Sequence, residues 1–246
     1  MGRLTANCLS AINHRKKGGG KMRVIFVRHG HPNYKNDCLT ELGHLHAEAA
    51  AERLSGETLK AIYASSCGRA VETAEHIAAR HGLPVIQCDF MREISWGSAD
   101  EEPIHLKGHP WDVADWMVSQ GQSIMQANWT EEAPFQRNKV TQNAIRVGKD
   151  FDQWLAELGY EREGDYYRVR NANEDTVMMV SHGGASSAVF SHLFNLPFPF
   201  VCHAFDIDFT SIAVLRFSGE NGSLTAPKIE LLDDARHIAG ITLENS

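Results

Sequence analysis

The feature that most constrains the fold is a pair of apolar runs, far apart in the chain, that each end in a histidine followed by a glycine. Met22–Val27 leads into Arg28-His29-Gly30, and Asp175–Val180 leads into Ser181-His182-Gly183. Such runs are typical of strands buried inside a parallel sheet. Because ligands bind beyond the carboxyl ends of strands in open α/β sheets, we expect two imidazoles at the ligand-binding edge of one sheet.

Strands and helices alternate between and around these two runs. Thr40 is the predicted N-cap of a helix, with Glu41 in the first turn, where a carboxylate suits the helix dipole. A long helix is predicted to begin at Pro134, because a proline costs little in a first turn. The other expected elements are strands over Leu59–Ala64, Val85–Cys88, Tyr166–Arg170 and Ser211–Phe217, and helices over about Gly68–His81 and Ala185–Phe194. This order predicts an α/β protein with a mostly parallel sheet.

Apolar residues at steps of three and four indicate which face each helix buries. The predicted inward residues are Leu42, Leu45, Ala49 and Leu54 in the first helix, Ala70, Ala74, Ile77 and Ala78 in the second, and Val140, Ala144, Val147, Phe151, Trp154, Leu155 and Leu158 in the long helix. Each of these faces is expected to pack on the sheet.

Charge and cysteine content exclude several kinds of partner. The net charge is −7, but residues 1–21 hold five basic side chains and no acid, so the remainder has 19 Lys and Arg against 31 Asp and Glu. So acidic a body is a poor general binder of nucleic acid or of an anionic membrane. The five cysteines are scattered without a C-x-x-C pair, which argues against a disulfide framework or a zinc ribbon. No apolar run approaches the roughly 20 residues that cross a bilayer, and we expect a cytoplasmic protein.

Residues 1–21 form a separate segment without apolar periodicity. Lys16-Lys17-Gly18-Gly19-Gly20-Lys21 stands directly before Met22, and purine-rich codons of the kind found in a bacterial ribosome-binding site would encode it. We therefore weigh two interpretations: a disordered tail, or a translated leader upstream of a natural start at Met22. The remainder, 22–246, is expected to be a single domain with an insertion at about 95–132.

Several short segments carry a more specific signal when taken together. Their order and spacing resemble the histidine phosphatase superfamily, also called the phosphoglycerate mutase-like family, over nearly all of Met22–Phe217. The segments are Arg28-His29-Gly30, Leu39-Thr40-Glu41-Leu42-Gly43, Ala64–Ala74 with Ser65, Ser66 and Arg69, Arg92-Glu93-Ile94, and Val180-Ser181-His182-Gly183-Gly184. The resemblance implies a three-layer α/β/α sandwich.

The resemblance also implies a mechanism. His29 would be the nucleophile and become transiently phosphorylated, which requires a neutral imidazole with one free nitrogen. Arg28 and Arg69 would hold the phosphate with bidentate guanidinium groups, and His182, expected to be protonated, would complete the pocket with Gly183. Glu93 would be the general acid and base. A small phosphorylated substrate is implied, without metal or other cofactor, nucleic acid or membrane; a homodimer is left open.

The chain departs from the family pattern beside the nucleophile. After Arg-His-Gly the family usually has Glu or Gln, then Thr, then an Asn a few residues on, whereas this chain has His31-Pro32-Asn33-Tyr34. His46 occupies a helix position that is usually Gln. The contact that this loop makes with the phosphate in the family is therefore not assigned to any residue of this chain.

Substrate choice is expected to lie in the insertion and in the loop Pro197–Asp208. The insertion is aromatic and acidic, with Lys107 almost its only cation, and Ser95–Asp100 lacks the basic stretch of the cofactor-dependent mutases. This favours hydrolysis of a phosphomonoester whose other end is not strongly anionic. Three alternatives are a mutase, a non-catalytic phosphate-binding module, and a metallohydrolase using His44, His46, His105 and His109.

Overall fold

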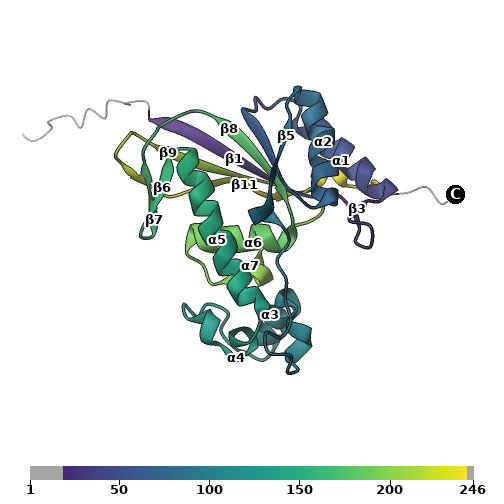
Figure 1. The fold of residues 1–246 in the computed structure, drawn as a ribbon, viewed down its shortest axis with the longest axis vertical. Coiled ribbons are helices and arrows are strands. Elements are labelled where there is room, and N and C mark those ends of the chain that lie inside the picture. The colour runs from purple at the N-terminus through teal and green to yellow at the C-terminus, as the bar shows by residue number, and fades with distance from the viewer. Residues whose placement is uncertain (1–18, 243–246) are drawn as a thin grey trace, which may run out of the picture.

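The computed structural model describes residues 19–242. Strands and helices alternate along the chain, and the helices pack around one central sheet (Figure 1). The strands are β1 (Gly20–Arg28), β2 (Pro32–Asn33), β3 (Cys38–Leu39), β4 (Ala61–Ser65), β5 (Val85–Cys88), β6 (Tyr160–Glu163), β7 (Tyr166–Val169), β8 (Thr176–Ser181), β9 (Ile212–Gly219), β10 (Leu224–Thr225) and β11 (Lys228–Asp234). The helices are α1 (Glu41–Leu54), α2 (Gly68–His81), α3 (Pro110–Ser119), α4 (Ala133–Gln136), α5 (Lys139–Glu157), α6 (Gly183–Phe194) and α7 (Phe198–Ala204).

The central sheet has six strands in the order β11-β9-β1-β8-β4-β5. β1, β8, β4 and β5 are parallel, and β9 and β11 add an antiparallel edge. The chain thus has the predicted α/β fold with a mostly parallel sheet. Because β8 lies between β1 and β4, three strands distant in sequence end side by side.

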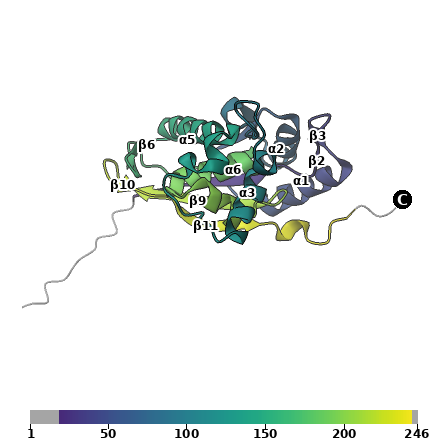
Figure 2. The ribbon, with the colours of Figure 1, turned by 90° about the horizontal axis from the view of Figure 1, so that it is seen from below.

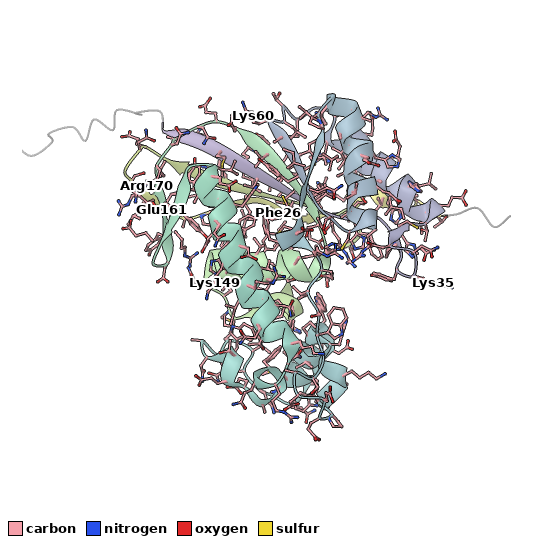
Figure 3. The ribbon with its side chains drawn as sticks, viewed as in Figure 1. Phe26, Lys35, Lys60, Lys149, Glu161 and Arg170 are labelled. Carbon is pink, nitrogen blue, oxygen red and sulfur yellow. The ribbon has the colours of Figure 1, made fainter. Side chains whose placement is uncertain are left out.

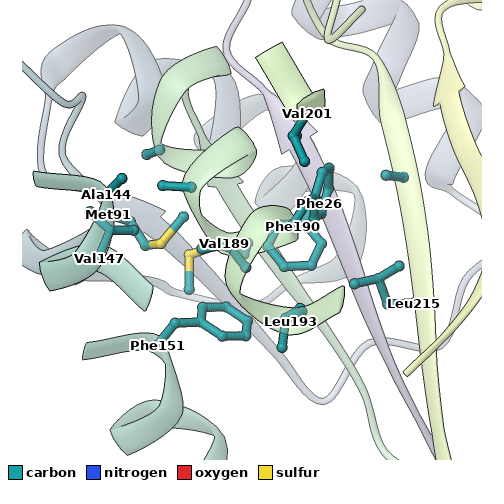
Figure 4. Close-up of a cluster of buried hydrophobic side chains, with 14 of the residues drawn as sticks. Phe26, Met91, Ala144, Val147, Phe151, Val189, Phe190, Leu193, Val201 and Leu215 are labelled. Carbon is teal, nitrogen blue, oxygen red and sulfur yellow. The ribbon is translucent and has the colours of Figure 1, made fainter. Parts of the chain in front are cut away.

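Alternate residues of β1 serve two separate cores. Val24 and Phe26 belong to the larger core, with α5 and α6, whereas Ile25 and Val27 face α1 and α2. The ring of Phe26 packs edge-on against Phe190, with centroids 5.1 Å apart, and lies 5.7 Å from Phe151 (Figure 4). Helices therefore cover both faces of the sheet, as the three-layer prediction requires.

Residues 1–21, interpreted above as a disordered tail or a translated leader, lie mostly outside the described residues. Within their described part, Gly20 and Lys21 belong to β1 and pair with Gly219 and Ser218. The ordered strand thus begins two residues before the boundary that we expected.

The first helix begins where predicted, and its buried face agrees with the prediction only in part. The hydroxyl of Thr40 accepts a hydrogen bond from the amide of Gly43 at 3.1 Å, which is an N-cap. Leu54 is buried as predicted, but Leu45 is 44% exposed, and Ala47, Ala50 and Ala51 are buried beside Leu54. Small residues form most of this face, where α1 packs against α2.

The predicted long helix is broken after its first turn. α4 ends at Gln136 and α5 begins at Lys139, with Asn138 as its N-cap. The buried Asn138 side chain accepts hydrogen bonds from the amides of Gly97 and Val140, both at 3.1 Å, and donates one to the carbonyl of Gly108 at 2.8 Å. This side chain therefore joins α5 to the insertion and stops the helix there.

The insertion forms a lobe beyond the carboxyl ends of the central strands. It contains α3 and short helical turns, and Figure 1 shows it below the sheet, next to α4 and α7. Figure 2 views the molecule from this end. The sequence patterns did not predict α7, β11 or β6. The strand β6 pairs with the predicted strand at Tyr166–Val169, β7.

Among residues 19–242, no helix combines the length and the apolar character that crossing a membrane requires.

Replacing Asn138 with alanine is expected to lower the free energy of unfolding by about 1–3 kcal/mol, since it leaves buried backbone groups of the insertion without partners. Urea denaturation measures the change. The control is Asn128→Ala, because Asn128 is exposed and its amide reaches only Glu131. Equal losses in the two variants would contradict the role assigned to Asn138.

Candidate active site

The carboxyl ends of β1, β8 and β4 bring three polar side chains together. Arg28 pairs in register with Ser181, and the amide of His29 donates to the Ser181 carbonyl at 2.9 Å. The rings of His29 and His182 consequently lie 5.1 Å apart, and both are buried. On the other side of β8, the Ser65 hydroxyl lies 2.8 Å from Nε2 of His182.

The His29 ring is fixed with one nitrogen available. Nδ1 lies 2.7 Å from the carbonyl of Gly30, which can only accept, so Nδ1 carries the proton. Nε2 therefore carries no proton, and its lone pair accepts a hydrogen bond from Nε of Arg69 at 3.3 Å. Burial, together with the charges of Arg28 and Arg69, lowers the pKa of His29 to about 3. The ring is neutral near pH 7, as a nucleophile requires.

Arg69 lies between the two imidazoles. Its Nε is 3.3 Å from Nε2 of His29, and its Nη2 is 3.0 Å from Nδ1 of His182. The carboxylate of Asp37 accepts from Nη1 of Arg69 and from the amide of Gly68 at the start of α2. The guanidinium is thus buried and held from three sides.

His182 differs from the expectation that it is protonated. Nδ1 must accept the hydrogen bond from Arg69, which leaves the proton on Nε2, facing Ser65. Burial lowers the pKa of His182 well below its usual value, and the nearby His29 and Arg69 lower it further. Without a bound anion the ring is neutral and orients Arg69.

Arg28 is positioned by the loop that follows α7. Its Nη1 donates to the carbonyl of Ile207, and its Cζ lies 4.2 Å from the ring centroid of Phe209. Nε of Arg28 is buried and has no hydrogen-bond partner among the described residues. A buried guanidinium N–H of this kind is a donor available to a bound anion.

Glu93 lies at the start of α6, opposite the arginines. Its carboxylate accepts hydrogen bonds from the amides of Ile94 and Ala185, both at 3.0 Å, and from that of Gly184 at 3.4 Å. Burial outweighs these bonds and raises the pKa of Glu93. A Cβ at position 184 would lie 2.7 Å from Oε1 of Glu93, so glycine is needed there.

A cavity of about 310 Å³ opens in front of Arg28 and Glu93. It is lined by Arg28, Tyr34, Glu93, Trp96, His109, Trp111, Gly183, Phe205, Asp206, Ile207 and Asp208. A larger cavity of about 460 Å³ lies between the insertion, α5 and α6, but it contains none of the predicted site residues. The cavity beside Arg28 is therefore the candidate active site.

The structure brings all six predicted site residues together: Arg28, His29, Arg69, Glu93, His182 and Gly183. Asp37, Tyr34 and Phe209 contact them and were missed. Asp37 stands only three residues before the predicted cap at Thr40, and no pattern singles it out. Phe209 directly follows the loop that we had assigned to substrate choice.

The unusual loop after His29 takes a different role from the family's. His31 turns to Thr40, with Nδ1 2.8 Å from Oγ1, and does not line the cavity. Tyr34 lines it instead, and the Arg69 Cζ lies 5.4 Å from its ring centroid. This loop thus presents an aromatic side chain to the cavity beside Arg69.

The four histidines of the metallohydrolase alternative do not gather. His44 is exposed and contacts His76, whereas His46 is buried. In the part of the chain that the structure describes, no group of three or more His, Cys, Asp and Glu side chains is arranged to hold a metal ion.

Comparisons with known proteins agree with this fold. A family model, the histidine phosphatase superfamily (branch 1), matches residues 24–229. A mycobacterial glucosyl-3-phosphoglycerate phosphatase has 23% identity and a TM-score of 0.59, over 87% of this chain and 99% of the other. A phosphoserine phosphatase from Entamoeba histolytica has 19% identity and a TM-score of 0.57, over 88% of this chain and 99% of the other. No curated protein sequence matches the chain.

The low pKa of His29 predicts how stability depends on pH. Between about pH 3 and pH 6.5 the unfolded chain binds a proton on this ring that the folded protein does not, so the free energy of unfolding rises with pH across this window. The slope contributed by one such ring reaches about 1.4 kcal/mol per pH unit. We expect His29→Asn to remove this contribution, as measured by urea denaturation across the window.

His44→Asn is the matched control, because the His44 side chain is about half exposed. Its slope should equal that of the unmodified protein. An unchanged slope in His29→Asn would show that His29 is not buried in its neutral form.

Proposed function

The chain belongs to the histidine phosphatase superfamily, branch 1, and we propose that it hydrolyses small phosphomonoesters through a phosphohistidine on His29. The observation that carries this proposal is the unprotonated Nε2 of His29, which accepts a hydrogen bond from Nε of Arg69 at 3.3 Å. A phosphate placed on Arg69 would put its phosphorus next to this nitrogen. Such placement of a nucleophile beside its target is a large part of phosphoryl-transfer catalysis.

In the first step, Nε2 of His29 forms a bond to phosphorus while the bond from phosphorus to the alcohol oxygen breaks. Glu93, whose pKa is raised by burial, donates a proton to that oxygen, and the alcohol leaves. In the second step, the Glu93 carboxylate takes a proton from a water molecule, whose oxygen forms a bond to phosphorus while the bond from phosphorus to Nε2 of His29 breaks. Inorganic phosphate leaves, and both His29 and Glu93 return to their starting states.

Arg28 and Arg69 together match the charge of a phosphate dianion. Their guanidinium groups are fixed before the substrate binds, by Ile207 and by Asp37 respectively, so little reorganisation accompanies the transfer. Two arginines so placed supply the charge stabilisation that a metal ion supplies in other phosphoryl-transfer enzymes, and we propose a metal-independent reaction.

The charge around the cavity favours hydrolysis over a mutase reaction. Arg28 is the one Lys or Arg among the described residues that line it. A phosphoglycerate mutase must also hold a second anionic group of its substrate, for which this cavity offers no further cation. The non-catalytic alternative is disfavoured because the low pKa of His29 suits a nucleophile and the raised pKa of Glu93 suits a general acid.

Replacing His29 with alanine is expected to lower kcat for p-nitrophenyl phosphate by at least about a thousandfold, since the nucleophile is gone. Both the unmodified protein and the control variant His44→Ala should stay active in excess chelator. Release of p-nitrophenol measures the rate. A fully active His29→Ala would overturn the proposed mechanism, and loss of activity in chelator would overturn its metal independence.

The role of Glu93 predicts a dependence on the leaving group. Glu93→Gln should lower kcat/KM by about a hundredfold or more for an alkyl phosphate, whose alkoxide needs a proton, and by less than about tenfold for p-nitrophenyl phosphate. In the unmodified protein, kcat/KM for the alkyl ester should fall as the pH rises through the raised pKa of Glu93. Equal losses for the two esters would exclude Glu93 as the general acid.

A further inference from the structure

We propose that the alcohol part of the natural substrate carries an ammonium group, so that the enzyme acts on phosphorylated amino alcohols, with a primary or a quaternary nitrogen. This inference rests on the proposed hydrolase function and concerns the outer half of the same cavity. The lining residues Arg28, Glu93 and Gly183 belong to the proposed catalytic set. We call the remaining lining residues the outer half, because they are left to receive whatever the phosphate is attached to.

The first observation is the charge of this outer half. Asp206 and Asp208 line it, and their carboxylates have neither an ion pair nor a hydrogen bond within residues 19–242. The amide of Asp208 donates to Asp233 at 3.0 Å, which brings another carboxylate near the rim. Once the phosphate is paired with Arg28 and Arg69, this negative charge remains without a counterion.

The lysines do not neutralise this negative charge. None lines the cavity among the described residues. Figure 3 shows Lys60 before β4, at the opposite end of the sheet, and Lys149 on α5. A carboxylate on the leaving alcohol would meet Asp206 and Asp208 without a cation to pair with, whereas an ammonium group would be attracted.

The second observation is the aromatic wall of the same half. Trp96 and Trp111 meet nearly at right angles, at 86° with centroids 6.1 Å apart, and His109 packs against both. Trp96 is nevertheless 38% exposed. Tyr34 and Phe205 line the cavity as well. Aromatic faces combined with carboxylates are the surroundings that bind organic ammonium groups, because the ring faces are electron-rich.

A neutral polyol could also pack on these rings, but it would gain nothing from the unpaired negative charge. The combination of the two observations is what selects a cation. It also distinguishes this cavity from one that takes phosphoglycerate, which carries a carboxylate, or phosphoserine, which carries both charges.

Two matched substrate pairs test the proposal. Phosphocholine and 3,3-dimethylbutyl phosphate have the same shape, but carbon replaces the charged nitrogen in the second. Phosphoethanolamine and O-phosphoserine differ by one carboxylate. We expect kcat/KM to be about tenfold higher for phosphocholine than for its neutral analogue, and about tenfold higher for phosphoethanolamine than for phosphoserine. One to two cation–π and ionic contacts supply a difference of this size.

In the double variant Asp206→Asn with Asp208→Asn, the ratio of kcat/KM for phosphocholine to kcat/KM for 3,3-dimethylbutyl phosphate should fall to within about twofold of one. Because the preference is a ratio within one variant, a general loss of activity cancels. Asp115→Asn is the control, since Asp115 is exposed, pairs with His203 and does not line the cavity. Its ratio should equal that of the unmodified protein.

The two levels of the account fail in distinguishable ways. No hydrolysis of p-nitrophenyl phosphate by the unmodified protein would reject the hydrolase function itself. Hydrolysis of that ester with equal rates for phosphocholine and its neutral analogue, or a preference for phosphoserine or for a neutral sugar phosphate, would reject the ammonium site alone. An unchanged ratio in the double variant would also reject it.

Discussion

Parallel pairing of β1 with β8 is the interaction on which the candidate site depends. His29 and His182 are more than half the chain apart in sequence, yet each directly follows the last residue of a strand, and the two strands are neighbours in register. A slip of one residue would turn the side chains at the strand ends to the other face of the sheet. The apolar residues of both strands prevent this slip, because they fill cores on both faces.

Arg69 shows how a buried cation can prepare a nucleophile. Its charge, added to burial, keeps both imidazoles neutral, and its N–H groups occupy positions beside both rings. The cost of burying a guanidinium is offset by Asp37 and by the two ring nitrogens that accept from it. The same contacts that hold Arg69 in place therefore define where a phosphate oxygen would bind.

The sequence was sufficient for the parts of the fold and site that depend on local patterns. Short motifs at strand ends located Arg28, His29 and His182, and the helical period of α2 placed Arg69 in its first turn. Contacts between distant loops could not be derived in this way. Asp37 reaches Arg69 across 32 residues, and Asn138 breaks a helix because of bonds to Gly97 and Gly108. The buried face of α1 was predicted only in part, because small residues beside Leu54 form most of its contact with α2.

The central claim is that Nε2 of His29 becomes phosphorylated. Mixing the protein with p-nitrophenyl phosphate, quenching in alkali within the first turnovers and digesting with trypsin releases the peptide His29–Lys35, which fragment masses can search for a phosphoryl group. The account predicts an acid-labile phosphoryl group on His29 that disappears once the substrate is exhausted. A phosphoryl group on His31, His182 or Cys67 instead, or a burst of p-nitrophenol with no phosphorylated peptide, would contradict it.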